Sequence, residues 1–206
     1  MSMPAMLPRI GLMGRARTGK DTAAGLLVPY GYTRLAFAEP LRDLAVEVDP
    51  YVGVVDGRAV RYTEAVMAVG YERAKDDHLE LRRVLQRLGT GARHVLGDSV
   101  WVDALAALVD AMPVWAPVVV TDVRFPNEAE RLRQLGFVMV RLTRTAAPPA
   151  GEHVSETALD RVPADVTYAN DGTVEDLRRF LVSKVLGSEA RQPGPPVQMR
   201  GGEVSC

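Results

Sequence analysis

The stretch Ile10–Thr22, IGLMGRARTGKDT, joins an apolar run to a glycine turn and then to a Gly-Lys pair at the spacing G-x-x-x-x-G-K. This order predicts a buried strand, a loop that holds phosphate groups and the first turn of a helix. The backbone N–H groups of such a loop and the positive end of the helix can bind a di- or triphosphate, and Lys20 can reach its terminal phosphates. A chance Gly-Lys turn is disfavoured, because a strand pattern precedes the loop and a helix pattern follows it. The stretch therefore restricts the possible functions of the chain to those of proteins that handle nucleotides.

Asp21 occupies the position after the lysine, where such loops usually carry a Ser or Thr that ligates magnesium, and Thr22 follows it. A carboxylate there can ligate magnesium directly or through water, because hard cations prefer oxygen ligands. The alternative is an acidic residue at a helix start, stabilised by the helix dipole. We favour the magnesium role, because this position faces the phosphates in loops of this kind.

The composition of the 206 residues, 47% hydrophobic and 25% charged, is that of one globular domain with a real core. A net charge of -1 gives no reason to expect binding to nucleic acid or to a membrane surface. Cys206 is the only cysteine, which excludes a disulfide framework and fits a reducing cytoplasm. The histidines match no zinc spacing, no apolar run is long enough to span a bilayer, and no signal peptide is expected.

Hydrophobic periodicity predicts strands and helices in alternation. Strands are expected at residues 8–13, 32–37, 117–122, 137–142 and 166–169. Helices are expected at residues 19–28, 39–48, 79–88 (ended by Gly89), 98–112, 126–135 and 173–186, with a mostly helical, loop-containing insert at 50–77. The alternation predicts a three-layer α/β/α fold of the P-loop NTPase type with a central parallel sheet, whose ligands lie at the carboxyl ends of the strands.

The segment Thr121–Glu128, TDVRFPNE, follows a strand of β-branched residues and places three charged groups at or just beyond its end. Asp122 can position magnesium or a substrate group, and the Arg124 guanidinium can grip phosphate oxygens. Glu128 lies about one helical turn further on. The alternative is a capped strand-to-helix turn with surface charges. We favour a functional site, because the three groups converge where such sheets bind ligands.

Several other side chains fall near the expected site, each with a simpler alternative. Trp101 lies on an amphipathic helix, where core packing is the default and base stacking the sharper alternative. Ser155 can cap a helix, and Asn170 begins a turn at a strand end. A single arginine is more often a solvated charge, but arginines are abundant around this site: Arg15, Arg17, Arg42, Arg82, Arg83, Arg93, Arg124 and Arg144.

Taken together, these segments resemble the phage deoxynucleoside monophosphate kinases, P-loop kinases related to adenylate kinase and dephospho-CoA kinase. The Gly-Lys-Asp-Thr loop and the Asp-Val-Arg-Phe-Pro-Asn-Glu segment are the most specific pieces. The matching pieces run in order along the chain: 14–22, 37–42, Arg82, 85–90, Arg93, 101–102, 121–128, His153, 155–156 and 170–172.

The resemblance implies transfer of the γ-phosphoryl group of ATP to a deoxynucleoside monophosphate (dNMP), with Mg²⁺ as cofactor. It implies catalytic roles for Lys20, Asp21, Arg124 and Arg144, the last as a lid-type arginine, and metal contacts from Asp21 and Asp122. The ATP-binding residues would be Gly14, Arg15, Ala16, Arg17, Thr18, Gly19, Lys20, Asp21, Thr22 and Asn170. The dNMP-binding residues would be Arg42, Arg82, Arg93, Trp101, Asp122, Arg124 and Glu128.

The resemblance also implies how the chain is divided. Residues 1–187 would form the kinase domain, with an acceptor-binding insert at about 50–97 and a lid at about 144–157, and residues 188–206 would be a disordered tail. The partners would be small nucleotides in the cytoplasm (the host's, for a phage protein), with no nucleic acid or membrane; monomer and homodimer stay open. A dephospho-CoA kinase-like enzyme and a P-loop ATPase switch remain the alternative functions.

Overall fold

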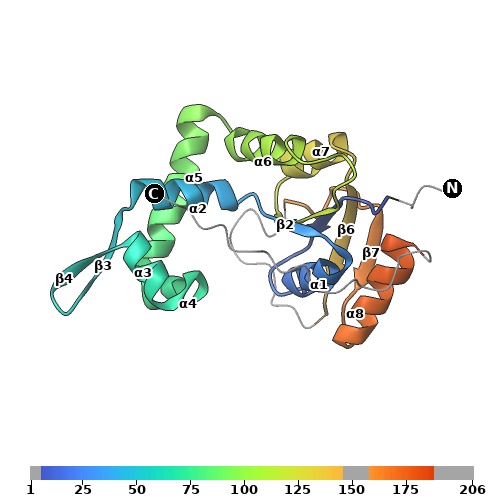
Figure 1. Cartoon of the computed structure of the whole chain (residues 1–206), viewed down its shortest axis with the longest axis horizontal. Coiled ribbons are helices and arrows are strands. Elements are labelled where there is room, and N and C mark those ends of the chain that lie inside the picture. Colours follow the sequence, from blue (N-terminus) through green and yellow to red (C-terminus); the bar gives the residue numbers. More distant parts are fainter. Residues whose placement is uncertain (1–5, 146–157, 188–206) are drawn as a thin grey trace, which may run out of the picture.

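A five-stranded parallel sheet lies at the centre of the computed structural model, which describes residues 6–145 and 158–187 (Figure 1). The strand order is β2-β5-β1-β6-β7, and each neighbouring pair is parallel. The strands are β1 (Ile10–Met13), β2 (Thr33–Leu35), β5 (Val118–Val123), β6 (Val138–Thr143) and β7 (Val166–Ala169). The expected parallel sheet is confirmed, and the central strands are buried on both faces as such sheets require.

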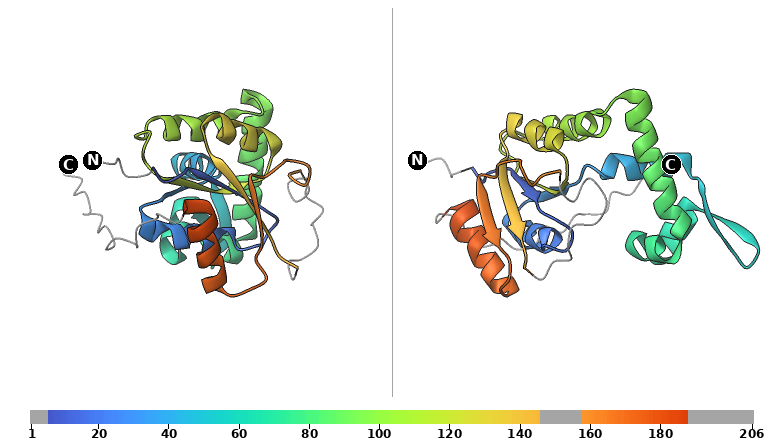
Figure 2. Two further views of the ribbon diagram at one scale, coloured as in Figure 1. Left: turned by 90° about the vertical axis from the view of Figure 1, so that its right-hand side faces the viewer. Right: turned by 180° about the vertical axis from the view of Figure 1, so that it is seen from behind.

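Helices cover both faces of the sheet and make it the middle of three layers (Figure 2). One core joins alternate strand residues such as Leu12 and Val119 to α1 (Lys20–Leu27) and α8 (Val174–Phe180), which continues into η3 (Leu181–Leu186). The other core joins Met13 and Val120 to α6 (Val100–Asp110) and α7 (Pro126–Gln134). A short turn of 3-10 helix, η1 (Val28–Tyr30), follows α1.

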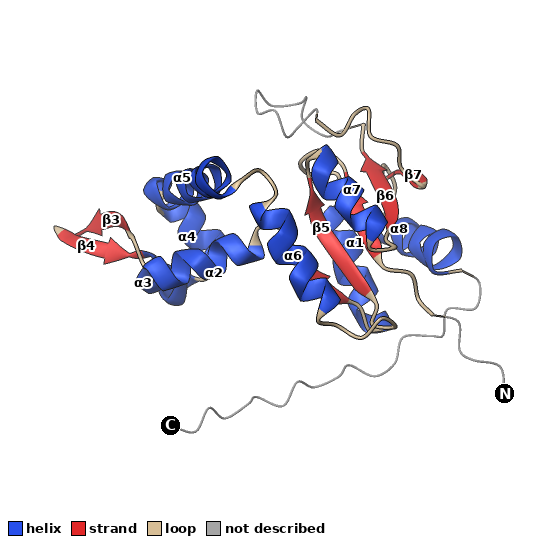
Figure 3. Cartoon of the chain, turned by 90° about the horizontal axis from the view of Figure 1, so that it is seen from above, coloured by secondary structure: helices blue, strands red, loops and turns tan. Residues whose placement is uncertain are grey.

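The residues between β2 and α6 form an insert that projects to one side of the sheet (Figures 1 and 3). Its elements are α2 (Glu39–Val48), β3 (Tyr51–Val55), β4 (Arg58–Arg61), α3 (Tyr62–Val69), α4 (Tyr71–Asp77) and α5 (Leu79–Leu96). The insert has an apolar core of its own, which includes Val52, Tyr62 and Leu81. It is therefore a packed unit beside the sheet.

Two sequence expectations about the insert are wrong in detail. Its first part is a β-hairpin, because Asp56 and Gly57 both have positive φ (51° and 79°), as a type I′ turn requires. Gly89 does not end α5, which runs on to Leu96. A glycine weakens a helix without breaking it. A residue of another helix supports Gly89, because the Gly89 carbonyl accepts a hydrogen bond of 3.1 Å from Trp101 Nε1.

Two further expectations fall outside the described residues, namely most of the lid and the tail from 188 on. The described residues contain no helix that is both long enough and apolar enough to cross a membrane.

Candidate active site

The loop between β1 and α1 follows a path that depends on its glycines. Gly14 has a φ of 144°, and a Cβ there would lie 2.3 Å from the carbonyl oxygen of Leu142. Gly19 has a φ of 97° and lies at the start of α1. Arg17, between them, is also left-handed at 61°, a conformation that is uncommon for a residue with a Cβ. The loop thus has the tight turn that phosphate-binding backbones need.

Lys20 lies over this loop. Its Nζ donates hydrogen bonds to the carbonyl oxygens of Gly14 at 2.6 Å and Arg15 at 2.7 Å. The ammonium group is therefore held beside the loop from which the sequence predicts phosphate binding.

Asp21 is on the first turn of α1 and is almost fully exposed, with 86% of its side chain accessible. Its Oδ1 lies 3.0 Å from Nη2 of Arg34 on β2. No group of three possible metal-ligating side chains occurs within residues 6–145 and 158–187. A magnesium contact from Asp21 thus stays a prediction, in which the carboxylate would share the ion with phosphates and water.

Asn170 supports the phosphate loop from the end of β7. The residue is 7% exposed, and its Nδ2 donates to the carbonyl oxygen of Thr18 at 3.0 Å. A Cβ on Gly19 would lie 2.4 Å from the same Nδ2, so the amide fits against the glycine. The resemblance implies ATP binding by Asn170, which stays a prediction, whereas its contact with the loop backbone could not be inferred because 152 positions separate the two residues.

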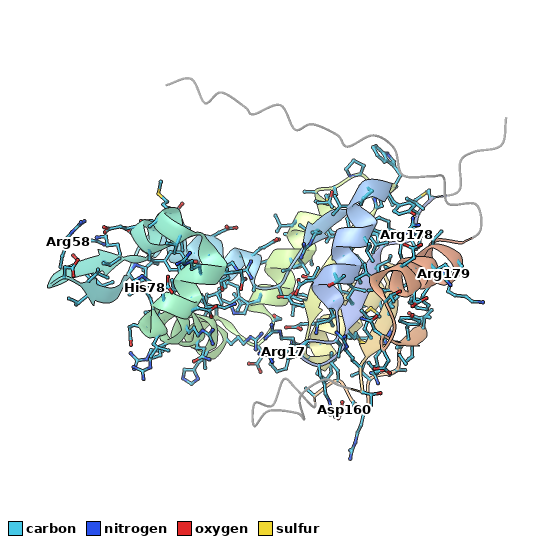
Figure 4. All side chains as sticks on the ribbon, turned by 90° about the horizontal axis from the view of Figure 1, so that it is seen from below. Arg17, Arg58, His78, Asp160, Arg178 and Arg179 are labelled. Atoms are coloured by element: carbon cyan, nitrogen blue, oxygen red, sulfur yellow. The ribbon has the colours of Figure 1, made fainter. Side chains whose placement is uncertain are left out.

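The arginines of the loop differ in their surroundings. Arg15 forms an ion pair of 2.9 Å with Asp160, from the segment before β7. Arg17 is exposed and lies between the sheet and the insert (Figure 4). The predicted ATP contacts of both residues stay predictions.

Asp122, at the end of β5, binds backbone. Its Oδ1 accepts a hydrogen bond from the N–H of Phe37 at 2.7 Å, and its Oδ2 accepts one from Ala38 at 3.1 Å. Burial raises the pKa of the carboxyl, although these bonds and the charges of Arg124 and Arg42 lower it. Asp122 thus ties β5 to the turn before α2, a role that the sequence did not suggest, and its metal contact stays a prediction.

Glu128, on the first turn of α7, is the most deeply buried charged group of the site at 2% exposure. Its Oε2 accepts hydrogen bonds from the N–H groups of Arg124 at 2.7 Å and Phe125 at 3.0 Å. Burial raises its pKa to about 7, against the lowering effect of these bonds and of Arg93. The sequence signal for this contact is a Glu at the third position of a helix, where the side chain can reach back to the helix start.

Arg93, on α5 of the insert, contacts Glu128. Its Nη2 lies 3.5 Å from Oε1 of Glu128, and its guanidinium lies 4.7 Å from the ring centre of Phe125. Its Nε is buried and has no hydrogen-bond partner in the described part of the chain. An unpaired buried donor is costly, so this group is suited to bind an acceptor atom from a ligand.

Arg42, on α2, also lies near this region: burial raises the pKa of Asp122 and of Glu39, and the charge of Arg42 partly offsets that rise. Its guanidinium lies 4.4 Å from the ring centre of Tyr71, and its buried Nε likewise has no partner among the residues described. Arg124 is exposed just beyond β5. The structure thus gathers three of the predicted acceptor arginines around Asp122 and Glu128.

Three other predicted residues are not part of this cluster. Arg82 donates to the Lys75 carbonyl oxygen at 3.0 Å and pairs with Asp76, about 16 Å along α5 from Arg93. Trp101 is buried, as expected for core packing. Arg144 is exposed after β6. His153, Ser155 and Glu156 fall outside the described residues.

Comparison with known proteins identifies the family of this chain. Residues 55–181 match the family model described as deoxynucleotide monophosphate kinase. A putative deoxynucleotide monophosphate kinase of Acanthamoeba polyphaga mimivirus is 26% identical over 192 residues, which cover 85% of this chain and 95% of that protein. The deoxynucleotide monophosphate kinase of Escherichia phage RB69 is 30% identical over 105 residues, 50% of this chain and 43% of that protein. The chain belongs to the deoxynucleotide monophosphate kinase family.

Proposed function

We propose that the chain transfers the γ-phosphoryl group of ATP to a deoxynucleoside monophosphate and releases a deoxynucleoside diphosphate and ADP. The observation that supports this proposal best is the contact of Arg93, from the insert, with Glu128 beside the end of β5. β5 pairs with β1, the strand that leads into the phosphate loop. A donor site at one strand end and a cluster of cations at the next are what transfer between two phosphates requires.

At the donor side, the loop backbone and Lys20 hold the β- and γ-phosphates of ATP. Asn170 keeps the Thr18 carbonyl in place, which fixes the loop behind them. Asp21 fits a magnesium ion that is shared with phosphate oxygens and water, and Asp122 is the second candidate. The ion would neutralise charge on the phosphates when bound. Arg144 approaches the transferred group from the lid side.

At the acceptor side, Arg42, Arg93 and Arg124 bind the phosphate of the monophosphate. The acceptor oxygen is already ionised, so no strong general base is needed. The chain's contribution is position and charge: it aligns the two phosphates and places cations where negative charge moves. Glu128 and Asp122 position these groups by holding the backbone of Arg124 and of the turn before α2.

The test is a panel of dNMPs and NMPs incubated with ATP and Mg²⁺, with products identified by mass. We expect ADP and a nucleoside diphosphate in equal amounts, and no product with Lys20→Ala. Phosphorylation of dephospho-CoA and of no dNMP would replace the proposal with a dephospho-CoA kinase-like function. Slow ATP hydrolysis that is indifferent to added monophosphates would favour a P-loop ATPase switch.

A further inference from the structure

We propose that Gln86 contacts the base of the acceptor nucleotide and thereby sets which base is accepted. This inference rests on the proposed kinase function. It assigns a specificity role to a residue of α5 that is separate from the phosphate-binding arginines.

The first step is the face of α5 on which Gln86 lies. The spacing of Arg82, Gln86, Gly89 and Arg93, in steps of four, three and four residues, places them on one stripe of the helix. At the end of this stripe Arg93 contacts Glu128 of the main body, and Trp101 of α6 contacts Gly89. In Figure 3, α5 lies at the edge of the insert, and a loop leads from it to α6 beside the sheet. Through Arg93, the end of the stripe that carries Gln86 therefore meets the main body.

The second step is the distance along that stripe. Gln86 lies seven residues before Arg93. Seven residues of helix span about 10 Å. A mononucleotide with its phosphate between Arg93 and Arg124 is long enough to bring its base toward Gln86. Arg82, one turn further on, is already paired with Asp76.

The third step is the local surface. Gln86 is exposed and makes no hydrogen bond to any described residue, whereas Arg83 on the neighbouring face pairs with Glu80 at 3.2 Å. A shallow hollow borders it, lined by Arg83, Gln86, Arg87, Thr90 and Gly91. Gly91 has no side chain to fill this hollow, and a Cβ built there would meet nothing within 4 Å. Gln86 thus offers a donor and an acceptor beside open space.

The chemistry of an amide suits a nucleobase. A Gln side chain has two N–H donors and one carbonyl acceptor, so it can form a bidentate pair with a base edge that presents one of each. A Glu at the same position only accepts. Guanine presents two neighbouring donors, N1–H and N2–H, whereas adenine presents a donor beside an acceptor. The substitution Gln86→Glu should therefore shift the preference toward guanine.

The experiment measures kcat/KM of the full chain for dGMP, dAMP, dCMP and dTMP at pH 8 with ATP and Mg²⁺. In Gln86→Glu we expect the dGMP-to-dAMP ratio to rise about 5- to 150-fold, the range for one bidentate pair. Gln134→Glu makes the same chemical change at the end of α7, and we expect it to leave the ratio unchanged. Gln86→Leu removes both hydrogen-bonding groups and should bring the four kcat/KM values closer together.

The outcomes separate this inference from the proposed function. If the wild-type chain phosphorylates dNMPs and both Gln86 variants keep its base ratios, Gln86 does not contact the base and the kinase function stands. A ratio in Gln86→Glu that moves away from dGMP also overturns the inference. If the wild-type chain phosphorylates no dNMP, the kinase function fails and the inference fails with it. Thermal melting of each variant shows whether the fold persists.

Discussion

Glu128 is a buried carboxylate that binds other groups of the protein. It holds two backbone N–H groups and Arg93, and burial raises its pKa to about 7. A carboxyl whose pKa is higher in the folded than in the unfolded state stabilises the fold most at low pH. That contribution is lost as the pH rises from the ordinary value, about 4.3, to about 7.

This titration predicts a pH-dependent difference between the wild-type chain and Glu128→Gln. Between pH 5 and 7 the free energy of unfolding of the wild type should fall relative to that of the variant, by about 2 kcal/mol. Urea unfolding of both proteins across this range measures the difference. A constant difference from pH 5 to 7 would show that Glu128 does not titrate there.

The backbone and the side chain of Arg124 have different roles. Its N–H holds Glu128, while its exposed guanidinium makes no hydrogen bond to any residue that the structure describes. Arg124→Ala should therefore keep the fold. It should lower kcat/KM about a hundredfold, because the acceptor phosphate then loses a charge-assisted hydrogen-bonding partner.

Arg179→Ala is the matched control for Arg124→Ala, since Arg179 is exposed on α8 and, among the residues described, forms its ion pair within that helix, with Asp176 (Figure 4). We expect normal turnover from this control. A folded Arg124→Ala variant with normal turnover would remove Arg124 from the mechanism.

Single residues also show where sequence reasoning succeeds and where it stops. Gly14 and Lys20 could be placed because the loop spacing is local and carries its own geometry. The contacts of Asn170 with Thr18 and of Asp122 with Phe37 could not, because they join segments far apart in the chain. The identity of a polar residue at a strand end indicates a site there, but the partner it binds depends on tertiary packing.

At the scale of elements, α5 contains two glycines, Gly89 and Gly91, with different surroundings. A Cβ on Gly89 would lie 3.2 Å from Cδ2 of Leu41, whereas one on Gly91 would meet nothing within 4 Å. Gly91→Ala should therefore stabilise the chain by up to about 1 kcal/mol, the helix propensity difference. Gly89→Ala should gain less or lose stability, because Leu41 must move.

Thermal melting of the two α5 variants tests this difference directly. A higher Tm for Gly89→Ala than for Gly91→Ala would contradict the packing seen around α5.

The hairpin and the length of α5 show which elements could be foreseen. Asp56 and Gly57 form a dipeptide that favours a two-residue hairpin turn, and β-branched residues lie on both sides of it. The signal for β3 and β4 was therefore present in the sequence. The run of α5 through Gly89 was not, since the contacts of Gly89 with Leu41 and Trp101 come from other elements.

At the scale of the whole molecule, two of the contacts between the insert and the main body involve carboxylates of β5 and α7. Asp122 holds the turn before α2 through Phe37 and Ala38, and Glu128 holds Arg93 near the end of α5. The alternation of strands and helices predicted the parallel sheet. Nothing local to the sequence predicted its strand order, or that the start and the end of the insert meet neighbouring residues of β5 and α7.

The first of these contacts can be loosened without removing the insert. In Asp122→Ala the amides of Phe37 and Ala38 lose their acceptors, so their hydrogen exchange should speed up at least tenfold, and the acceptor KM should rise because Arg42 follows this turn. Asp165→Ala is a control at another backbone contact, the N–H of Met139. Unchanged exchange at residues 37 and 38 would show that Asp122 does not hold this turn.

The position of β1 at the centre of the sheet, with β5 beside it, has a geometric consequence for catalysis. Neighbouring strands lie about 4.8 Å apart, a spacing that backbone hydrogen bonds fix and that side chains cannot stretch. The supports of the two substrates therefore begin one strand apart on a rigid frame. The sheet thus fixes the alignment of the two phosphates. Motion during a turnover is limited to the groups above the sheet.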